Sequence, residues 1–486
     1  MDLNWQISSL ESRESGNGGD RARCRGKHKF IVLICLSVLV TALVPLGVTP
    51  SFADEIAPSA EISWEDAPTI DGTSAIIMDA GSGDILYEKN AYERRDPASI
   101  TKILTCLVVL ETMELEQEVT IPYDGDGVGN NIALKKGEVL TVEQLLYAMT
   151  VYSANDAAEM LAVTAGGTME NFCDMMNERA ERCGAESTTF TNANGMNYYG
   201  QENHKTTAYD LAMISREAMK NKTFRKLVST VEYTIPATNL SKARKLKSTN
   251  KCLYEEKKTL EVDGKKRPYL YEGTLGIKTG STGASGECFC GWAKKGGTNL
   301  IAISLNASSE DERFADVIKL WDYGFSKYYT YTAAKASEPV DEVRVRRGNK
   351  SRIALGVRED VDLTLNQGYD SENITTRIAL NDEKLTAPVE KGAALGTLVV
   401  YKEDRVVAEA ELYAMESAEE GLIFSYIGIA DEHLPFVAGA LLVALLVFIW
   451  FRRFHIQHSR RRRMRRRARR HRKMRRKEWE KERRPF

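Results

Sequence analysis

The feature that most constrains this chain is an uncharged apolar run near its C-terminal end, residues 434–451, followed at once by Arg452 and Arg453. Its 18 residues are just long enough to cross the hydrocarbon core of a bilayer as a helix. From residue 452 to the end there are 19 Lys and Arg against 3 Asp and Glu. Basic flanks stay on the cytoplasmic side of a membrane. We therefore expect one membrane helix over 433–452 and a basic cytoplasmic tail over 453–486.

A second apolar run, residues 30–48, lies near the N-terminus and follows a stretch with five basic residues, 21–29. The small residues Ser51 and Ala53 come directly after it. This order of basic, apolar and small residues predicts a secretory signal peptide over 1–53, with an uncleaved anchor helix as the alternative. In either case the middle of the chain is expected outside the cytoplasm.

The charge of the chain is divided between these regions. The net charge is only -1, but residues 30–451 hold 42 basic and 61 acidic side chains, so an acidic body carries a basic tail. Such a tail could also bind nucleic acid. Because it follows a membrane span directly, attraction to anionic lipid headgroups is the simpler interpretation. We expect the membrane as a partner, through the C-terminal helix, and no nucleic acid.

Between the two apolar runs, the spacing of apolar residues and glycines predicts two folded domains. Helical spacing appears over four segments and again over 311–328, while a hairpin pattern precedes them and Gly-punctuated strands fill 275–307. The four central helical segments are 99–113, 141–166, 170–184 and 207–219. This arrangement predicts an α/β domain, residues 54–332, with a largely antiparallel sheet and a helical cluster. Short alternating stretches after it predict a small all-β domain, residues 335–416.

The cysteines favour no metal site. Their spacing matches no zinc-binding pattern, and buried apolar thiols are a better interpretation than disulfides. The six outside the leader are Cys106, Cys173, Cys183, Cys252, Cys288 and Cys290.

A serine and a lysine three residues apart begin the helix predicted over 99–113. Ser99 and Lys102 would project from one face of that helix, and Pro97 suits its start. Free backbone N–H groups at a first helical turn would stabilise an oxyanion near the serine. An amine kept neutral by burial could take the serine proton. The pair predicts a nucleophile with its own base, although most Ser-x-x-Lys pairs are a helix cap beside a solvated lysine.

Two further motifs follow in order. Ser153 and Asn155 lie at the end of an apolar helical segment, 54 residues after Ser99. A Lys-Thr-Gly-Ser run lies at a strand edge, 125 residues after Ser153. The run consists of Lys278, Thr279, Gly280 and Ser281. Each motif alone is common; in this order they are the signature of penicillin-binding enzymes and serine β-lactamases.

Four blocks extend this match and resemble one family. The blocks "RRDPASITKILT", "GEVLTVEQLLYAMTVYSANDAAEMLA", "TNANGMNYYGQENHKTTAYDLA" and "GIKTGSTGASGECF" resemble the low-molecular-mass penicillin-binding proteins that act as D-alanyl-D-alanine carboxypeptidases. The resemblance covers residues 72–330 and continues through 338–415, which look like the C-terminal β domain of that family. It implies a penicillin-binding/β-lactamase-like fold with no cofactor and no metal. It implies peptidoglycan stem peptides as substrates and β-lactam antibiotics as acylating inhibitors.

The resemblance also implies residue roles. Ser99 would attack the carbonyl of the penultimate D-alanine, with Lys102 as base and Ser153 as proton relay to the leaving amine. Asn155 would hold the amide side chain of the acyl donor. The terminal carboxylate would be bound by Lys278 and Thr279. The oxyanion would lie at the backbone N–H groups of Ser99 and Ser281.

Other functions fit the residues less well. A second Ser-x-x-Lys pair, Ser248 and Lys251, has no helix predicted after it, and the glycine-rich run 124–132 lacks the strand and helix of a phosphate loop. His204 is expected to be structural, which leaves too few histidines for a Ser-His-Asp hydrolase or a metal enzyme. A serine β-lactamase of the same fold and a non-catalytic wall-binding scaffold remain as alternatives.

Overall fold

The computed structural model describes residues 66–482 except 126, 199, 337 and 383. The predicted signal peptide, residues 1–53, lies outside the described residues. The described part begins with a five-stranded antiparallel sheet in the order β2-β1-β11-β10-β9. Its strands are β1 Ser74–Asp79, β2 Ile85–Lys89, β9 Thr274–Thr282, β10 Gly286–Lys295 and β11 Thr298–Ala307. The predicted hairpin and the largely antiparallel sheet are confirmed.

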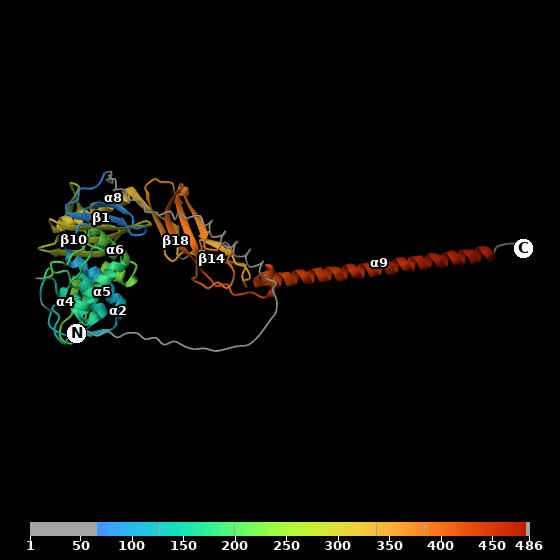
Figure 1. Cartoon of the computed structure of the whole chain (residues 1–486), viewed down its shortest axis with the longest axis horizontal. Coiled ribbons are helices and arrows are strands. Elements are labelled where there is room, and N and C mark those ends of the chain that lie inside the picture. Colours follow the sequence, from blue (N-terminus) through green and yellow to red (C-terminus); the bar gives the residue numbers. More distant parts are fainter. Residues whose placement is uncertain (1–65, 126, 199, 337, 383, 483–486) are drawn as a thin grey trace, which may run out of the picture. The chain divides into compact units, whose positions relative to one another are not determined.

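Alternation along these strands divides the core into two layers, because successive side chains of a strand point to opposite faces. On β1, Ile76 and Met78 face the helical cluster, whereas Ile77 packs on the other face against helix α8, Glu310–Lys327. Cys288 and Cys290 of β10 lie in the first layer and are buried without a disulfide. Figure 1 shows α8 on the opposite side of the sheet from the cluster.

The helical cluster is built from α2 to α7. Its members are α2 Lys102–Thr112, α3 Val142–Val151, α4 Asn155–Gly166, α5 Met169–Arg182, α6 Ala208–Ala218 and α7 Lys222–Ser229. Thr141 caps α3 in a capping box with Gln144, and Thr207 caps α6. The helix predicted over 141–166 is two helices, because the chain turns at 152–154, where Ser153 has φ +68°. A non-glycine residue in that conformation cannot continue an α-helix.

Short two-stranded ribbons edge the cluster and sheet. They pair β3 Glu118–Thr120 with β4 Val139–Thr141, β5 Glu232–Ile235 with β6 Arg244–Lys247, and β7 Thr259–Val262 with β8 Lys265–Pro268. Two 3-10 turns matter for the site: η1 Ala98–Thr101 and η2 Lys251–Leu253.

The predicted all-β domain is confirmed as a C-terminal β structure with its own core. One sheet has the order β13-β14-β18-β17-β16, and a ribbon pairs β12 with β15. The bounds are β12 Tyr328–Ala334, β13 Asp341–Arg344, β14 Arg352–Gly356, β15 Val361–Asn366, β16 Ile374–Leu380, β17 Ala394–Lys402 and β18 Arg405–Ala414. A further 3-10 turn, η3, covers Ser371–Asn373.

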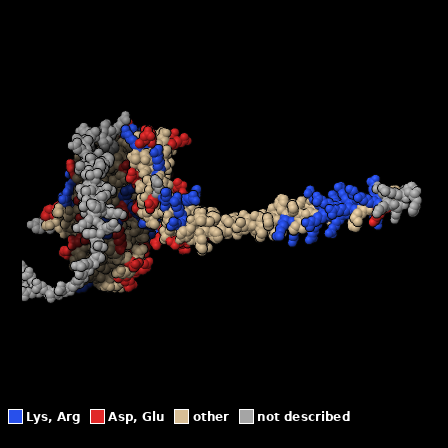
Figure 2. Space-filling model, turned by 45° about the vertical axis from the view of Figure 1, so that its right-hand side comes forward, with Lys and Arg blue, Asp and Glu red and all other residues tan. Residues whose placement is uncertain are grey.

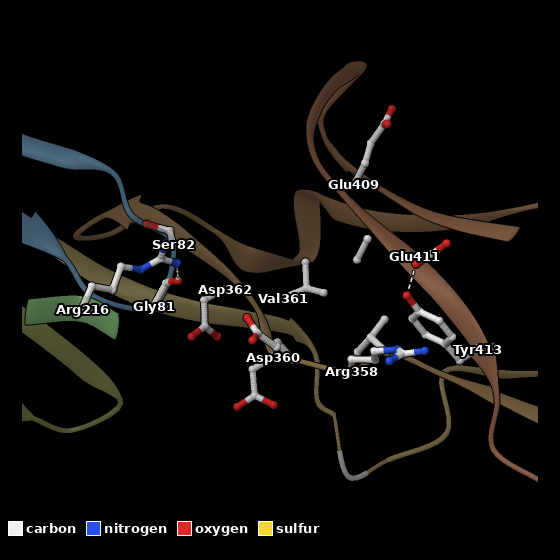
Figure 3. A pocket seen from close by; sticks show the side chains of 13 residues that line it. Gly81, Ser82, Arg216, Arg358, Asp360, Val361, Asp362, Glu409, Glu411 and Tyr413 are labelled. Atoms are coloured by element: carbon white, nitrogen blue, oxygen red, sulfur yellow. Dashed lines mark hydrogen bonds between the residues drawn. The ribbon is translucent and has the colours of Figure 1, made fainter. Parts of the chain in front are cut away.

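The turn between β1 and β2 contacts β15. Ser82 Oγ lies 2.6 Å from Thr364 Oγ1, and a Cβ on Gly81 would lie 2.4 Å from Asp362 Oδ2, so only glycine fits there. A cavity of about 310 Å³ opens beside this contact. Figure 3 shows Gly81, Ser82 and Arg216 at one end of it and Glu411 and Tyr413 at the other.

The chain ends in two 3-10 turns, η4 Ile423–Ile427 and η5 Asp431–His433, and the long helix α9, Leu434–Glu482. This helix is long and apolar enough to cross a membrane, with a mean hydropathy of 2.6 in its most apolar window. Figure 2 shows its first part free of charge and its second part covered by Lys and Arg. The predicted C-terminal helix is therefore present and fits a membrane anchor.

Candidate active site

The first functional side chains lie where η1 passes into α2. Ala98 has φ +47°, a strained conformation for an alanine, and it turns the chain so that Ser99 enters the helix from a half-buried position. Lys102 begins α2 one turn later and is only 1% exposed. The sequence therefore places a hydroxyl at the surface of a cavity and an amine behind it.

The Lys102 amine has three oxygen neighbours and no ion-pair partner among the described residues. Its Nζ lies 2.8 Å from Ser99 Oγ, 2.7 Å from Asn155 Oδ1 and 2.6 Å from the carbonyl oxygen of Asn194. Burial lowers the pKa of Lys102 well below its ordinary value, and the nearby positive charge of Lys278 lowers it further. Such an amine loses its proton more readily than an ordinary lysine.

Ser153 and Asn155 meet this pair from the break between α3 and α4. Both are buried, Ser153 at the turn and Asn155 as the first residue of α4. The Asn155 amide nitrogen donates to the carbonyl of Val128 at 2.9 Å, which fixes the side-chain oxygen towards Lys102. Asn155 therefore contacts Lys102, and Ser153 lines the same cavity as Ser99.

The loop predicted as a plain connection, residues 124–132, forms one wall here. Asp156 accepts hydrogen bonds from the backbone N–H groups of Ile132 and Leu134, at 3.1 Å each to Oδ2. The backbone N–H of Asn155 donates to Asn130 O at 2.6 Å. Gly129 and Asn130 line the cavity. Residues 124–132 therefore border the site although they do not form a phosphate loop. Nothing in the sequence of this loop indicated that position.

Strand β9 forms the opposite wall with the Lys-Thr-Gly-Ser run. The Thr279 hydroxyl donates to Thr249 Oγ1 at 2.7 Å, and the Ser281 hydroxyl donates to Glu287 Oε1 at 2.6 Å. Lys278 is 2% exposed and donates to the carbonyl of Thr279 at 2.9 Å. Burial lowers the pKa of Lys278 to about 7, and the positive charge of Arg313 contributes to that shift.

Gly280 is where β9 comes closest to η1. A Cβ at Gly280 would lie 2.9 Å from Ala98 Cβ and 3.0 Å from the backbone nitrogen of Ser99, closer than real Cβ contacts. Only glycine allows the strand backbone to pass directly beside the Ser99 N–H. Gly195 meets η1 from another side, since a Cβ there would lie 1.8 Å from Ala98 O.

Together these elements enclose a cavity of about 440 Å³. From the predicted set it is lined by Ser99, Ser153, Asn155, Thr279, Gly280 and Ser281. Lys102 and Lys278 lie buried behind that lining, close enough for the charge of one to lower the pKa of the other. In the part of the chain that the structure describes, no group of three or more His, Cys, Asp or Glu side chains could hold a metal ion.

Three parts of the site were missed from the sequence. Arg313 of α8 lines the cavity, donates to Gly280 O at 3.1 Å and forms an ion pair with Glu287. Asn194 supplies the third acceptor for Lys102. The segment set aside as an unrelated pair also lines the cavity, through Ser248 and Lys251. Nothing in the sequence marked these residues as part of the site: Ser248 and Lys251 were set aside for lack of a following helix, and Asn194 lay in a matching block without a role.

Ser248 and Lys251 differ from Ser99 and Lys102 in their hydrogen bonds and ion pairs. Lys251 forms an ion pair with Glu310 at 2.6 Å and lies over the ring of Tyr269, 4.7 Å from its centroid. The Ser248 hydroxyl accepts a hydrogen bond from the backbone N–H of Asn250 at 3.2 Å. This lysine forms its contacts with Glu310 and Tyr269 instead of that serine, so the pair does not reproduce the arrangement of Ser99 and Lys102.

His204 lies outside the cavity lining and supports η1 from behind. Its Nδ1 accepts from the backbone N–H of Thr191 at 3.0 Å, so its Nε2–H donates to Thr101 Oγ1 at 2.9 Å. Burial lowers the pKa of His204 to about 4. The neutral ring has both nitrogens satisfied, which fits a structural role.

Comparison with known proteins identifies the family. The profile of the D-alanyl-D-alanine carboxypeptidase family, peptidase family S11, matches residues 61–309, and that of the penicillin-binding protein 5 C-terminal domain matches residues 328–420. The D-alanyl-D-alanine carboxypeptidase DacF of Bacillus subtilis is 31% identical over 400 residues, covering 81% of this chain and 96% of that protein. DacC of Escherichia coli is 30% identical over 371 residues, covering 74% and 87%.

Solved structures agree. Penicillin-binding protein 5 of Haemophilus influenzae superposes with a TM-score of 0.57 at 26% identity, covering 73% of this chain and 99% of that one. A penicillin-binding protein 3 from Streptococcus pneumoniae gives 0.57 at 27% identity, covering 72% and 100%. With both domains matched in order and one relative aligned over nearly its whole length, the chain belongs to the D-alanyl-D-alanine carboxypeptidase family S11 of low-molecular-mass penicillin-binding proteins.

Proposed function

We propose that this protein is a serine-type carboxypeptidase that removes the terminal D-alanine from peptidoglycan stem peptides through an acyl-enzyme on Ser99. The observation that carries this proposal is the buried Lys102 amine, 2.8 Å from the Ser99 hydroxyl, whose pKa is lowered by burial and by the charge of Lys278 against the smaller opposing effect of Asp156. Family membership supplies the substrate class.

Lys102 Nζ has three acceptors, and two of them, Asn155 Oδ1 and Asn194 O, can only accept. A protonated Lys102 donates to all three, including Ser99 Oγ. In the neutral form proposed for the reaction, two N–H bonds would go to Asn155 and Asn194, and the lone pair would face the Ser99 hydroxyl. That hydroxyl can donate its proton to Lys102 as it attacks, which is the arrangement required of a general base.

Binding the terminal carboxylate of the substrate requires a fixed positive charge. Lys278 is buried beside the cavity with only a backbone carbonyl as partner, so its charge is uncompensated until an anion binds. A bound carboxylate favours the protonated lysine. Thr279 and Arg313 line the cavity next to it. A peptide that ends in a carboxylate would be held with its last amide bond near Ser99.

The proposed reaction has two halves. Ser99 Oγ attacks the carbonyl carbon of the penultimate D-alanine while Lys102 takes its proton, and the backbone N–H groups of Ser99 and Ser281 stabilise the oxyanion. The C–N bond breaks as Ser153 relays a proton to the leaving amine, and free D-alanine departs. Water then cleaves the ester, returning the hydroxyl and releasing the shortened peptide. Asn155 would hold the acyl donor, and β-lactams would acylate Ser99 by the same first half.

We also propose the placement of the chain in the cell envelope. The catalytic domain, 54–332, and the β domain, 335–416, would lie outside the cytoplasm. A single span at 433–452 would carry the basic tail, 453–486, into it. The apolar and basic halves of α9 support this orientation through the positive-inside rule.

The test is acylation of the full chain by a fluorescent penicillin, with release of D-alanine from a D-Ala-D-Ala peptide measured in parallel. Ser99→Ala should abolish both. Ser248→Ala is the matched control, because that serine lines the same cavity and also stands three residues before a lysine. Equal labelling of Ser99→Ala and parent would refute the proposal. Rapid turnover of a chromogenic cephalosporin would favour a β-lactamase instead.

A further inference from the structure

An apolar loop precedes the span. We define the juxtamembrane loop as residues 421–433, which join the β domain to α9. Five of its large side chains are exposed, with Ile423 85% and Ile427 73% accessible. The five are Leu422, Ile423, Phe424, Tyr426 and Ile427. Soluble surfaces rarely gather so many apolar side chains in one short segment, so this patch needs a partner.

The juxtamembrane loop is folded, and the β domain holds it at both ends. At its start, the backbone N–H of Gly421 donates to Arg347 O at 2.9 Å. At its end, Glu432 accepts from the backbone N–H of Ser351 at 2.8 Å and donates its own N–H to Asn349 O at 3.2 Å. All three partners lie between β13 and β14, so the loop is fastened to one turn of the domain.

Internal bonds close the loop and turn its apolar side chains outward. The Asp431 carboxylate accepts from the backbone N–H of Leu422 at 3.0 Å, and the N–H of Ile429 donates to Phe424 O at 3.1 Å. Ser425 is buried and its hydroxyl donates to Leu422 O at 2.7 Å. With these polar groups bonded within the fold, the segment 422–427 exposes mainly apolar side chains.

Chain length brings this surface to the membrane. Leu434, where α9 and its apolar run begin, lies only seven positions after Ile427. Even a fully extended chain would keep Ile427 within about 25 Å of that point at roughly 3.5 Å per residue, and the loop is folded. The interfacial layer of a bilayer is about 5–7 Å deep on each side of its core. A span at α9 therefore keeps Ile427 within reach of the headgroups, at most about 25 Å from the start of the span.

The neighbouring charges suit headgroups as well. Arg344, Arg346 and Arg347 line a cavity of about 300 Å³ together with Tyr426 of the loop. None of the three forms an ion pair among the residues that the structure describes. The Arg347 guanidinium lies over the Tyr426 ring, 5.3 Å from its centroid. Guanidinium groups bind phosphate oxygens, and an aromatic ring with a polar tip favours the interface.

We propose that the juxtamembrane loop inserts into the leaflet on the side of the β domain and forms a second membrane contact beside the span. Its apolar side chains enter the interfacial layer, and the adjoining arginines contact phospholipid phosphates. One helix alone leaves the domain free to tilt, whereas a helix with an adjacent inserted loop fixes its orientation relative to the membrane. The proposal rests on α9 spanning the membrane and is independent of the reaction at Ser99.

The experiment places an environment-sensitive fluorophore on single added cysteines of the full chain in phospholipid vesicles. The six native cysteines of the described part are buried, and the parent chain gives the background. The test site is Ile423→Cys. The matched control is Val406→Cys, an apolar residue 51% exposed at the start of β18, about 25 Å along that strand from its other end. Leu445→Cys, within α9, reports the span.

Spin-labelled phospholipid should quench the probes at 423 and 445 and leave the probe at 406 unaffected. In a variant with Ile423→Glu and Ile427→Glu, a probe on Phe424→Cys should lose its quenching. Quenching at 445 without quenching at 423 would overturn the loop proposal alone. A blue-shifted probe at 423 that lipid does not quench would mean contact with protein, such as a second copy, and would also overturn it. No quenching at 445 would refute the span and the loop together.

Discussion

Replacing Gly280 by alanine tests the close approach of β9 to the Ser99 backbone. The added Cβ would lie 2.9 Å from Ala98 Cβ and 3.0 Å from Ser99 N, whereas ordinary contacts begin near 3.4 Å. The strand must therefore move away from η1 by about half an ångström, because packed interiors leave no room for Ala98 to yield. Ala98 is fully buried at a strained backbone position, which restricts it further.

That shift acts on the oxyanion site. An oxyanion hydrogen bond of about 2.9 Å to the Ser281 N–H would lengthen to about 3.4 Å, outside the range of effective donors. Losing one such donor costs on the order of 100- to 1000-fold in rate, or about 3–4 kcal/mol of transition-state stabilisation. We expect Gly280→Ala to lower the acylation rate by about 100-fold, at the lower end of that range, since the donor is displaced and not removed.

The assay is the rate of acylation by a fluorescent penicillin, with thermal unfolding measured on the same samples. Gly283→Ala is the matched control, because Gly283 lies in the turn of the same hairpin with nothing within 4 Å of its added Cβ. It should acylate like the parent. If Gly280→Ala acylates within about threefold of the parent while both remain folded, β9 does not hold an oxyanion donor against Ser99.

Three further predictions follow from the buried polar groups. Lys278→Arg should abolish the fall in kcat/KM as pH rises above about 7. In the proposed role Lys278 binds the substrate carboxylate, and it loses its positive charge above that pH whereas a guanidinium does not. An unchanged alkaline limb would contradict this. His204 has a folded pKa of about 4 against about 6.5 unfolded, so stability should fall by roughly 3 kcal/mol as the pH drops from 6.5 to 4. His204→Gln should lack that component in denaturant titrations, and an identical pH dependence would contradict it. Asp156→Asn weakens the hydrogen bonds that the carboxylate accepts from the backbone N–H groups of Ile132 and Leu134. Amide hydrogen exchange across residues 127–134 should therefore become faster, and kcat/KM should fall about tenfold. Unchanged exchange would show that other contacts hold the loop.

The helices and strands of this fold could be predicted from the sequence, because burying one face of a helix or strand repeats apolar residues with the period of that element. The alternation of Ile76, Ile77 and Met78 on β1 divides the two core layers, and Thr141 and Thr207 cap helices at the positions where the predicted helical segments begin. The break between helices α3 and α4 at Ser153 could not be predicted from the sequence. Its flanks are apolar with helical spacing, and a positive φ at serine follows from tertiary contacts rather than from local preference.

The same distinction separates the parts of the site that could be predicted from those that could not. A motif marks residues whose chemistry demands one side chain at one spacing, as for Ser99 and Lys102 or Lys278 and Thr279. Asn194 acts through a backbone carbonyl that any residue would carry, and Gly129 and Asn130 form a wall through the path of their loop. Contributions made through the backbone do not determine which residue type occupies the position. The Asn194 carbonyl is one of them, and together with the motif residue Asn155 it supplies the two acceptors that would leave a neutral Lys102 amine free to face the serine.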